Sequence, residues 1–416
     1  MNDSVVIVGA GHAGVSLAFK LRALGCVGQI TLISDEPDIP YQRPPLSKKY
    51  LMGTVDADRM HIKNQSLYER EGIDLRLNCK VSAIQRDERY VDLADGRQLR
   101  YDKLVLATGA RARCLPTGPQ TKSYGAAENI YTFRTLRDAV ALRSEMIAGK
   151  NLLIIGGGYI GLETAAVARS LGMHVTLIER DSRILGRVAS TETADYFRSL
   201  HSENGVEIRE AATLHELSCV GNRVVAARLN DGTVIDTDAV VVGVGVIVET
   251  GLAEQAGLTL DNGIVVDEQG RTADPSIYAI GDCASFPYQD RLIRLESVQN
   301  AVDMAEVVAR SMMGTWVEYR PVPWFWSDQY ATKLQIAGLN QGYSHVVIRR
   351  QSDEAFSIWY YKDRQLLAVD AINDAKAFMT AKRWIGEGVS PLDDEIGDVS
   401  VALSAISPSP VTAQMR

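Results

Sequence analysis

V-V-I-V-G-A-G-H-A-G, residues 5–14, is typical of an apolar strand that enters a glycine-rich turn, and L-L-I-I-G-G-G-Y-I-G at residues 152–161 repeats this form. In such a turn the first glycine makes the bend, the second lets the backbone approach a pyrophosphate, and the third lets helix and strand pack closely. The phosphates then lie at the N-terminus of the next helix, where unpaired N–H groups and the helix dipole favour negative charge. The repeat therefore predicts two dinucleotide-binding folds in one chain.

Each copy continues as a complete strand, helix and strand. An amphipathic helix is expected to about Leu24 in the first copy and to about Leu171 in the second. The following strand ends at Asp35 in the first copy and at Glu179 in the second. An acidic residue about twenty positions after the turn bonds the ribose hydroxyls of a nucleotide. A turn that serves no ligand needs neither the helix nor the acid, so we interpret both copies as nucleotide sites.

The composition limits the class of protein. The chain has 416 residues, of which 46% are hydrophobic and 23% are charged, and its net charge is -8. This size predicts two or three globular domains, and the negative charge argues against a general nucleic-acid binder. No leader precedes the first strand and no apolar run is long enough to span a bilayer, so we expect a cytoplasmic protein with no membrane segment. The sequence leaves the oligomeric state open.

The five cysteines and six histidines form no pattern that indicates chemistry. The cysteines are spread singly with no C-x-x-C pair, which argues against a disulfide framework and against thiol exchange. The histidines lack the spacing of metal ligands, so no metal site is expected. We interpret the cysteines as reduced structural thiols.

A third motif assigns the two folds to their cofactors. Thr272-x5-Tyr278-Ala279-Ile280-Gly281-Asp282 is a strand whose end presents a carboxylate able to bond the ribityl chain of a flavin. The alternative is an aspartate that only caps the next segment, which the two nucleotide folds upstream disfavour. Because the motif occurs once, we predict one FAD, and a nicotinamide cofactor in the second fold.

At this point the chain resembles the FAD-dependent, NAD(P)H ferredoxin reductases of bacterial oxygenase systems, a group that includes putidaredoxin reductase and biphenyl dioxygenase reductase. The resemblance extends from Val5 to about residue 390. It is carried by Pro44-Pro45-Leu46-Ser47-Lys48, Gly156 to Glu163, Gly281 to Ala284, Glu296 to Ala301 and, most specifically, P-W-F-W-S-D-Q at residues 323–329. It implies electron transfer from NAD(P)H through FAD to a 2Fe-2S ferredoxin, which docks transiently and feeds a cytochrome P450 or a Rieske dioxygenase.

The predicted fold class is α/β, with two Rossmann-like dinucleotide-binding domains in a glutathione reductase-like two-fold architecture plus a C-terminal α+β domain. Beyond residue 325 the sequence changes to alternating patterns, as in Phe356 to Tyr361, followed by a helix-like stretch from Asp374 to Trp384. The expected boundaries are an FAD-binding domain at 1–112 and 246–326, an NAD(P)H-binding domain at 113–245, the C-terminal domain at 327–400 and a flexible tail at 401–416.

The resemblance implies a set of FAD-binding residues. Asp282, Val298 and Trp326 would line the ribityl chain and the isoalloxazine. Ser297 is also expected to cap a helix to about Met312, whose positive end would stabilise an anionic reduced flavin. The full set is Gly9, Gly11, His12, Ala13, Gly14, Asp35, Glu36, Arg43, Lys48, Val81, Thr108, Gly109, Arg134, Gly281, Asp282, Ser297, Val298 and Trp326.

A second implied set binds the nicotinamide cofactor. Glu179 favours NADH, because a carboxylate that bonds the 2'-hydroxyl repels a 2'-phosphate. Arg180, Arg183 and Arg187 suit a phosphate, so NADPH stays possible, unless they form an ordinary solvated face. The full set is Gly156, Gly158, Tyr159, Ile160, Gly161, Glu163, Glu179, Arg180, Arg187, Gly243 and Gly245.

No acid–base catalyst is expected from the protein, because the chemistry belongs to the flavin. Lys48, Glu163 and Trp326 are interpreted as tuning groups. We expect Lys48 and Glu163 to form an ion pair near the flavin; the alternative is two unrelated surface charges.

Three other functions remain open at this level. They are a disulfide or peroxide reductase of the same architecture, an NADH oxidase or quinone reductase, and a redox and interaction protein like apoptosis-inducing factor. A ferredoxin partner predicts a local basic docking patch, since such ferredoxins are usually acidic. The candidates are Arg111, Arg294, Lys376, Lys382 and Arg383.

Overall fold

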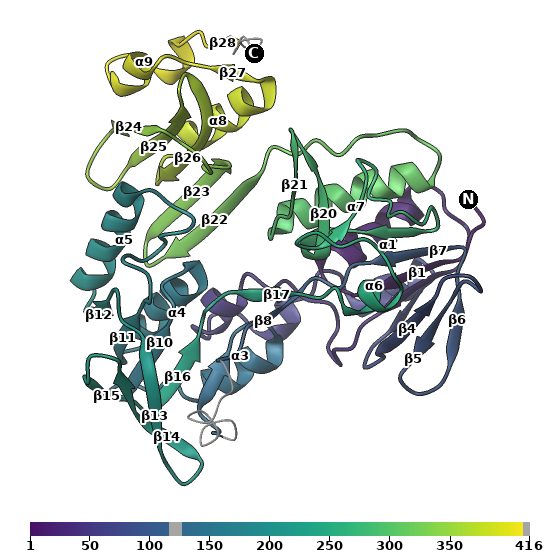
Figure 1. The fold of residues 1–416 in the computed structure, drawn as a ribbon, viewed down its shortest axis with the longest axis horizontal. Helices are drawn as coiled ribbons and strands as arrows, with labels where there is room; N and C mark the ends of the chain where they lie inside the picture. The colour runs from purple at the N-terminus through teal and green to yellow at the C-terminus, as the bar shows by residue number, and fades with distance from the viewer. Residues whose placement is uncertain (116–126, 411–416) are drawn as a thin grey trace. The chain divides into compact units, whose positions relative to one another are not determined.

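The computed structural model describes residues 1–115 and 127–410 of the chain, which form two compact units (Figure 1). The first unit contains Met1–Arg43, Val55–Arg111 and Val246–Pro321. The second contains Pro44–Thr54 and the described residues of 112–245 and 322–416. Residues 44–54 and 322–326, which the sequence analysis assigned to the FAD-binding domain, thus belong to the second unit. The three-domain division itself stays a prediction.

A parallel five-stranded sheet forms the centre of the first unit. Its strands in sheet order are β19 (Ile277–Ala279), β7 (Lys103–Leu106), β1 (Val5–Val8), β2 (Ile30–Ile33) and β3 (Ile73–Arg76). The strand β1 is entirely buried, as expected for β-branched residues in the middle of a covered parallel sheet. Two long helices, α1 (His12–Ala23) and α7 (Val298–Met312), pack against each other in this unit.

The second unit contains a parallel sheet with the corresponding strand order, except that one edge strand precedes the glycine turn in sequence instead of coming last. Its strands in sheet order are β12 (Val206–Arg209), β11 (His174–Ile178), β10 (Asn151–Ile155), β16 (Ala239–Val242) and β9 (Ile130–Thr132). The helix α4 (Tyr159–Ser170) follows β10 as α1 follows β1. The α/β class and the duplicated dinucleotide fold are therefore confirmed.

The duplication goes further than the glycine turns. In each copy a three-stranded antiparallel sheet is inserted in sequence before a parallel strand: before β7 in the first unit and before β16 in the second. It is made of β4 (Val81–Gln85), β5 (Tyr90–Leu93) and β6 (Gln98–Arg100) in the first unit, and of β13 (Leu214–Val220), β14 (Arg223–Leu229) and β15 (Val234–Asp236) in the second. The sequence analysis did not identify these short, partly exposed strands.

The C-terminal part of the second unit is an antiparallel sheet with one long helix against it, α8 (Ala375–Glu387) (Figure 1). The strands in sheet order are β22 (Trp324–Gln329), β23 (Thr332–Gly338), β26 (Gln365–Ile372), β25 (Phe356–Lys362) and β24 (His345–Arg350). Trp359 from the sheet and Trp384 from the helix are almost fully buried in the core between them. The α+β character of this region is confirmed.

The segment after Ser400 is not a flexible tail as far as the structure describes it. Leu403 and Ile406 are buried in the C-terminal core, and Ser409–Pro410 (β28) pairs with Val389–Ser390 (β27). The prediction is therefore wrong for residues 401–410, because two apolar residues in a Ser- and Pro-rich sequence find a hydrophobic surface. Residues 411–416 lie outside the described residues.

The remaining elements include two small sheets, β18-β20-β21 and β17-β8, together with helices and turns. They are η1 (Leu46–Tyr50), η2 (Ala57–Met60), α2 (Gln65–Arg70), β8 (Ala110–Ala112), α3 (Leu136–Arg143), α5 (Thr191–Glu203), β17 (Val246–Val248), α6 (Gly251–Gln255), β18 (Ile264–Val265), η3 (Gly281–Cys283), β20 (Ala284–Tyr288), β21 (Arg291–Ile293), α9 (Asp393–Gly397) and η4 (Leu403–Ala405).

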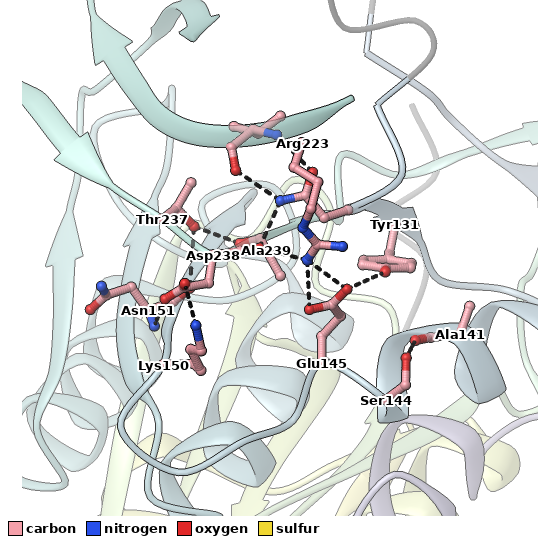
Figure 2. Close-up of polar contacts among 12 residues, drawn as sticks. Tyr131, Ala141, Ser144, Glu145, Lys150, Asn151, Arg223, Thr237, Asp238 and Ala239 are labelled. Carbon is pink, nitrogen blue, oxygen red and sulfur yellow. Dashed lines mark hydrogen bonds and ion pairs between the residues drawn. The ribbon is translucent and has the colours of Figure 1, made fainter. Parts of the chain in front are cut away.

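Two carboxylates, of Asp238 and Glu145, accept hydrogen bonds from residues in and next to the second parallel sheet (Figure 2). Asp238, just before β16, accepts hydrogen bonds from the backbone N of Asn151 at 2.8 Å and from Lys150 Nζ at 2.9 Å. The Asn151 bond is the main reason that the pKa of Asp238 lies below its usual range. Glu145 accepts from Tyr131 Oη at 3.0 Å and from Arg223 Nη2 at 2.8 Å. Hydrogen bonds to these two carboxylates thus join the start of β10 to the segment before β16, and β9 to the segment after α3.

Candidate functional site

The first glycine of each turn is required by the backbone itself. Gly9 has a φ of 110°, and a Cβ placed on it would lie 2.2 Å from the carbonyl oxygen of Ala107. Gly156 has a φ of 108°, and its Cβ would lie 2.4 Å from the oxygen of Gly243. Any side chain here would therefore clash with the backbone just after the neighbouring parallel strand, β7 or β16, whether or not a ligand is present.

The second glycine of each turn has a different role. A Cβ on Gly11 or on Gly158 would meet no protein atom within 4 Å, and neither glycine has a positive φ. The fold therefore does not require glycine at these two positions. The open space in front of them fits a group that must approach the backbone, as a pyrophosphate does.

The helices that follow these turns begin without a side-chain cap. Gly11 and Gly158 are the N-cap residues of α1 and α4, and neither helix has a capping side chain. The helices α5 and α7, in contrast, begin with the serine caps Ser190 and Ser297. No side-chain cap therefore occupies the first turn of α1 or of α4, the place where a helix favours an anion such as the pyrophosphate of FAD or NAD(P)H.

The flavin motif lies next to the first turn. A Cβ on Gly281 would lie 3.0 Å from Cβ of Ala13 in α1. Asp282 follows on η3, and Arg294 donates to its carbonyl oxygen at 3.1 Å. Ser297 accepts from the backbone N of Asn300 at 3.1 Å, which confirms it as the cap of α7. The structure therefore brings Gly281 of the flavin motif against the start of α1, next to the phosphate turn, within the first unit.

The two acids predicted to close the strands do not occupy equivalent positions. The backbone N of Gly9 donates to Ile33 O and that of Gly156 donates to Ile178 O, both at 2.8 Å. The residue after each acceptor is Ser34 in the first copy and Glu179 in the second. Glu179 accepts from the backbone N of Gly157 at 2.7 Å, which places its carboxylate at the turn. Asp35 is exposed one position later, and its binding to ribose stays a prediction.

Other predicted FAD residues form a second polar group in the first unit. Arg43 makes an ion pair with Glu36 at 2.5 Å, and Tyr41 Oη donates to the same carboxylate. Thr108 Oγ1 donates to the carbonyl oxygen of Glu249 at 2.6 Å. The first group ties residues 36–43 together after β2, and the Thr108 bond joins the turn after β7 to the segment after β17.

The expected ion pair between Lys48 and Glu163 is present. Lys48 Nζ lies 2.9 Å from Glu163 Oε1, and the two side chains are only 16% and 5% exposed. The alternative of two unrelated surface charges is therefore wrong. Ser47 and Ser327 also donate to this carboxylate, at 2.7 and 2.6 Å. The sequence analysis gave no role to either serine, although both lie in motifs that it quoted.

The predicted residues divide between the units as follows. The second unit contains the whole nicotinamide set and three predicted FAD residues, and the other FAD residues lie in the first unit. The three are Lys48, Arg134 and Trp326. The ring of Tyr159 lies 5.0 Å from that of Phe325, and its hydroxyl is buried. Gly243 packs beside Gly161, and Gly245 accepts from the backbone N of Arg113.

The three arginines after Glu179 are not equally available to a phosphate. Arg183 Nη1 donates to the carbonyl oxygens of Ala189 and Ser190, at 3.0 and 2.8 Å, so it supports the loop before α5. Arg180 and Arg187 are exposed. The possible contribution to NADPH binding therefore narrows to Arg180 and Arg187.

Asp370 on β26 is a second buried carboxylate in this unit, away from the predicted cofactor residues in sequence. It is fully buried and accepts from Tyr360 Oη and, at 2.7 Å, from Thr193 Oγ1. The backbone N of Ser190 donates to the same tyrosine hydroxyl at 3.0 Å. The carboxylate therefore links the C-terminal sheet to the start of α5.

Replacing Asp370 with asparagine is expected to change the pH dependence of unfolding. Burial raises the pKa of Asp370 to about 6 from 3.8. The native state thus binds this proton more tightly than the unfolded chain. The free energy of unfolding therefore falls as the pH rises from about 4, and the loss reaches its full size above about pH 6. Urea unfolding measures the free energy of unfolding of Asp370→Asn and of the wild type. The difference between them should change by about 2 kcal/mol in favour of Asp370→Asn when the pH is raised from about 4.5 to about 8. A difference that does not vary with pH would contradict this.

Other kinds of site find no support among residues 1–115 and 127–410. All five cysteines are free thiols, and Cys26, Cys79 and Cys283 are buried. In this described part of the chain no three His, Cys, Asp or Glu side chains gather as metal ligands. Nor does that part include a helix with the length and apolar character needed to cross a membrane.

Comparisons with known proteins agree with this architecture. A family model described as pyridine nucleotide-disulphide oxidoreductase matches residues 3–305, and one described as the reductase C-terminal domain matches residues 324–407. Putidaredoxin reductase of Pseudomonas putida is 42% identical, over 97% of each chain, and rhodocoxin reductase of Rhodococcus erythropolis is 41% identical, over 96% of this chain and 93% of that protein. The crystal structure of the covalent putidaredoxin reductase–putidaredoxin complex matches with a TM-score of 0.94 at 42% identity, covering 97% of each chain.

Proposed function

The chain belongs to the pyridine nucleotide-disulphide oxidoreductase family, among its ferredoxin reductases with a reductase C-terminal domain, and from this premise we propose that it transfers electrons from NAD(P)H through FAD to a 2Fe-2S ferredoxin. The ferredoxin would feed a cytochrome P450 or a Rieske dioxygenase. FAD, when bound, accepts an electron pair as a hydride and passes the electrons on singly.

One observation carries the proposal: the two glycine turns have uncapped helix ends and open space in front of Gly11 and Gly158. The turn that lies beside Gly281 and Asp282 would hold FAD, and the turn that Glu179 closes would hold NAD(P)H. The protein supplies position and electrostatics there. As the resemblance implies, the Lys48 ammonium group, which is paired with the buried Glu163, would supply a fixed charge at the flavin.

A disulfide reductase is the poorer alternative for this site. Such enzymes need a reactive cysteine next to the flavin. In this chain the residue before Lys48 is Ser47 and not a cysteine, and its hydroxyl donates to Glu163. Burial raises the pKa of the Cys283 thiol, the cysteine nearest to the flavin motif in sequence, so it is a poor nucleophile.

Stopped-flow mixing tests the proposed function. The FAD-loaded protein is reduced with NADH and then mixed separately with a 2Fe-2S ferredoxin, with a quinone and with oxygen. The proposal expects the ferredoxin to be the fastest acceptor. Fast transfer to oxygen or to the quinone alone would instead identify an oxidase or a quinone reductase. Slow transfer to all three, with a long-lived complex with NAD, would indicate a protein like apoptosis-inducing factor.

We further propose that NADH is preferred to NADPH, and Glu179→Gln is expected to weaken that preference. Without its charge the side chain no longer repels a 2'-phosphate, and the ratio of kcat/KM for NADH to that for NADPH should fall about tenfold, or about 1.4 kcal/mol. Steady-state kinetics with both coenzymes provide the measurement. Arg183→Met is the control, since Arg183 is bound to backbone oxygens and should leave the ratio unchanged. An unchanged ratio in Glu179→Gln would refute the preference.

The ferredoxin docking surface is proposed to lie on α8. Of the five candidates, Arg294 is only 13% exposed and pairs with Glu296, and Arg111 pairs with Glu249. Lys376 and Arg383 are exposed on α8 beside Met379, which is 62% exposed. Lys382 lies 5.0 Å from the ring of Trp324 on β22. This basic face with one apolar residue suits an acidic partner.

The double substitution Lys376→Glu with Arg383→Glu is expected to lower the rate of ferredoxin reduction by about tenfold or more at low salt. Ferricyanide reduction should stay unchanged, because a small acceptor needs no steering. The control is Lys80→Glu with Arg100→Glu, which makes the same change in net charge at two exposed residues of the first unit. Equal losses in both double variants, or a parallel loss with ferricyanide, would show that α8 is not the docking surface.

We place the protein in the cytoplasm as part of this proposal. NAD(P)H is a cytoplasmic reductant, and all five cysteines are free thiols, which suits a reducing compartment.

A further inference from the structure

The carboxylate of Glu163 accepts hydrogen bonds from two hydroxyl groups in addition to its ion pair with Lys48. Glu163 lies on α4 and is 4% exposed. Oε1 receives Lys48 Nζ at 2.9 Å and Ser327 Oγ at 2.6 Å, and Oε2 receives Ser47 Oγ at 2.7 Å. A buried carboxylate is tolerated only with such compensation. The two hydroxyls come from different elements, η1 and β22.

A second row of side chains lies behind Ser327. Its single hydroxyl hydrogen is used toward Glu163, so its oxygen must accept, and Gln329 Nε2 donates to it at 3.1 Å. This fixes the orientation of the amide and turns Gln329 Oε1 toward His201 Nε2, at 2.7 Å. The histidine must therefore carry its proton on Nε2. Its Nδ1 is then left to accept from Tyr330 Oη, at 3.4 Å.

All four bonds donate in one direction, from Tyr330 through His201, Gln329 and Ser327 to the carboxylate. Hydrogen bonds aligned in this way polarise one another and strengthen the last one. Ser327, Gln329 and His201 are all buried, so water does not compete for these groups. Burial also lowers the pKa of His201 to about 4, which keeps the ring neutral near neutral pH. The chain thus delivers fixed dipoles, and no second charge, to Glu163.

We infer that Ser327, oriented by Gln329 and His201, is a positioning residue that fixes the carboxylate of Glu163 and, through it, the ammonium group of Lys48. The inference rests on the proposed function, in which Lys48 lies at the flavin. In that role Ser327, Gln329 and His201 determine how strongly the ammonium group stabilises the reduced flavin. A merely structural role would be to join β22 to α4, for which apolar side chains of similar size would serve as well or better.

The test compares Ser327→Ala and Gln329→Met with the rescuing variant Ser327→Thr, which retains the hydroxyl. Ser357→Ala is the matched control. Ser357 is equally buried in the same antiparallel sheet, but its hydroxyl bonds Trp359 and Asp374 instead. Two quantities are measured on each FAD-loaded protein: the midpoint potential of the flavin, and the thermal unfolding temperature.

Ser327→Ala and Gln329→Met are expected to weaken the binding of reduced relative to oxidised flavin about tenfold, which lowers the midpoint potential by about 30 mV. Ser327→Thr should restore the potential, and Ser357→Ala should leave it unchanged while losing stability. If Ser327→Ala and Gln329→Met lose stability but keep the wild-type potential, the row is only structural and the inference fails. The proposed function fails separately, if the wild-type flavin is not reduced by NADH.

Discussion

Replacing Gly158 with valine is expected to leave the protein yellow and raise KM for NADH at least about a hundredfold. The position accepts a side chain without conflict, since a Cβ there meets no protein atom within 4 Å. The new side chain would fill the space that the pyrophosphate needs. Losing two backbone hydrogen bonds to a charged phosphate costs about 3 kcal/mol, which is about a hundredfold in affinity. Steady-state kinetics and the FAD content of the purified protein are the measurements.

The other turn glycines provide the contrast for this result. Gly11→Val occupies the equivalent position in the first copy and should yield a folded protein with little FAD. Gly156→Val should fail differently, because its Cβ would lie 2.4 Å from the oxygen of Gly243 and disturb the fold itself. If Gly158→Val instead loses FAD and keeps its KM for NADH, the assignment of the two turns to the two cofactors is reversed.

Glu163→Gln is expected to lower the rate of flavin reduction by NADH about a hundredfold. The amide retains the shape of the side chain, but the Lys48 ammonium loses the carboxylate with which it forms an ion pair, 2.9 Å away. A charge left buried without compensation is destabilising and moves toward water. If Lys48 supplies a fixed charge at the flavin, as we propose, its displacement costs about 3 kcal/mol of electrostatic stabilisation, which corresponds to the hundredfold loss. Single-turnover absorbance changes under anaerobic conditions measure the rate.

The double variant Lys48→Met with Glu163→Gln separates chemistry from folding. It removes the unpaired charge, so much of the stability lost in Glu163→Gln should return in thermal unfolding. The rate of flavin reduction should stay low, because the ammonium is absent. Recovery of the rate together with the stability would mean that the pair serves the fold alone.

The duplicated fold was predictable because short sequence patterns within each copy indicate each of its elements. An apolar strand, a glycine turn, a helix and a second strand are each recognisable from short spacings, and the observed registers of β1 with β2 and β10 with β11 agree with them. The strand end was less predictable. Asp35 was predicted as the counterpart of Glu179, but the hydrogen bond of Gly9 with Ile33 gives that strand position to Ser34, and the binding of Asp35 to ribose stays a prediction. The residue at which a strand ends depends on its hydrogen bonds with neighbouring strands, and the amino-acid sequence of the strand alone does not show these.

The surroundings of Glu163 could be predicted only in part. The pair with Lys48 followed from the resemblance, and the structure places the two together. The row through Ser327, Gln329 and His201 joins β22 to α5 across 128 residues of sequence between the glutamine and the histidine. No local pattern links residues so far apart. The burial of Leu403 and Ile406 was missed for a related reason, since their partners lie on other segments.

The central claim is that one chain holds an FAD in its first fold and an NADH in its second. Anaerobic titration of the purified protein with NADH, followed by flavin absorbance, tests it most directly. We expect one FAD per chain, fully reduced by one equivalent of NADH. A protein that takes up no FAD, or a bound flavin that NADH leaves oxidised, would contradict the account.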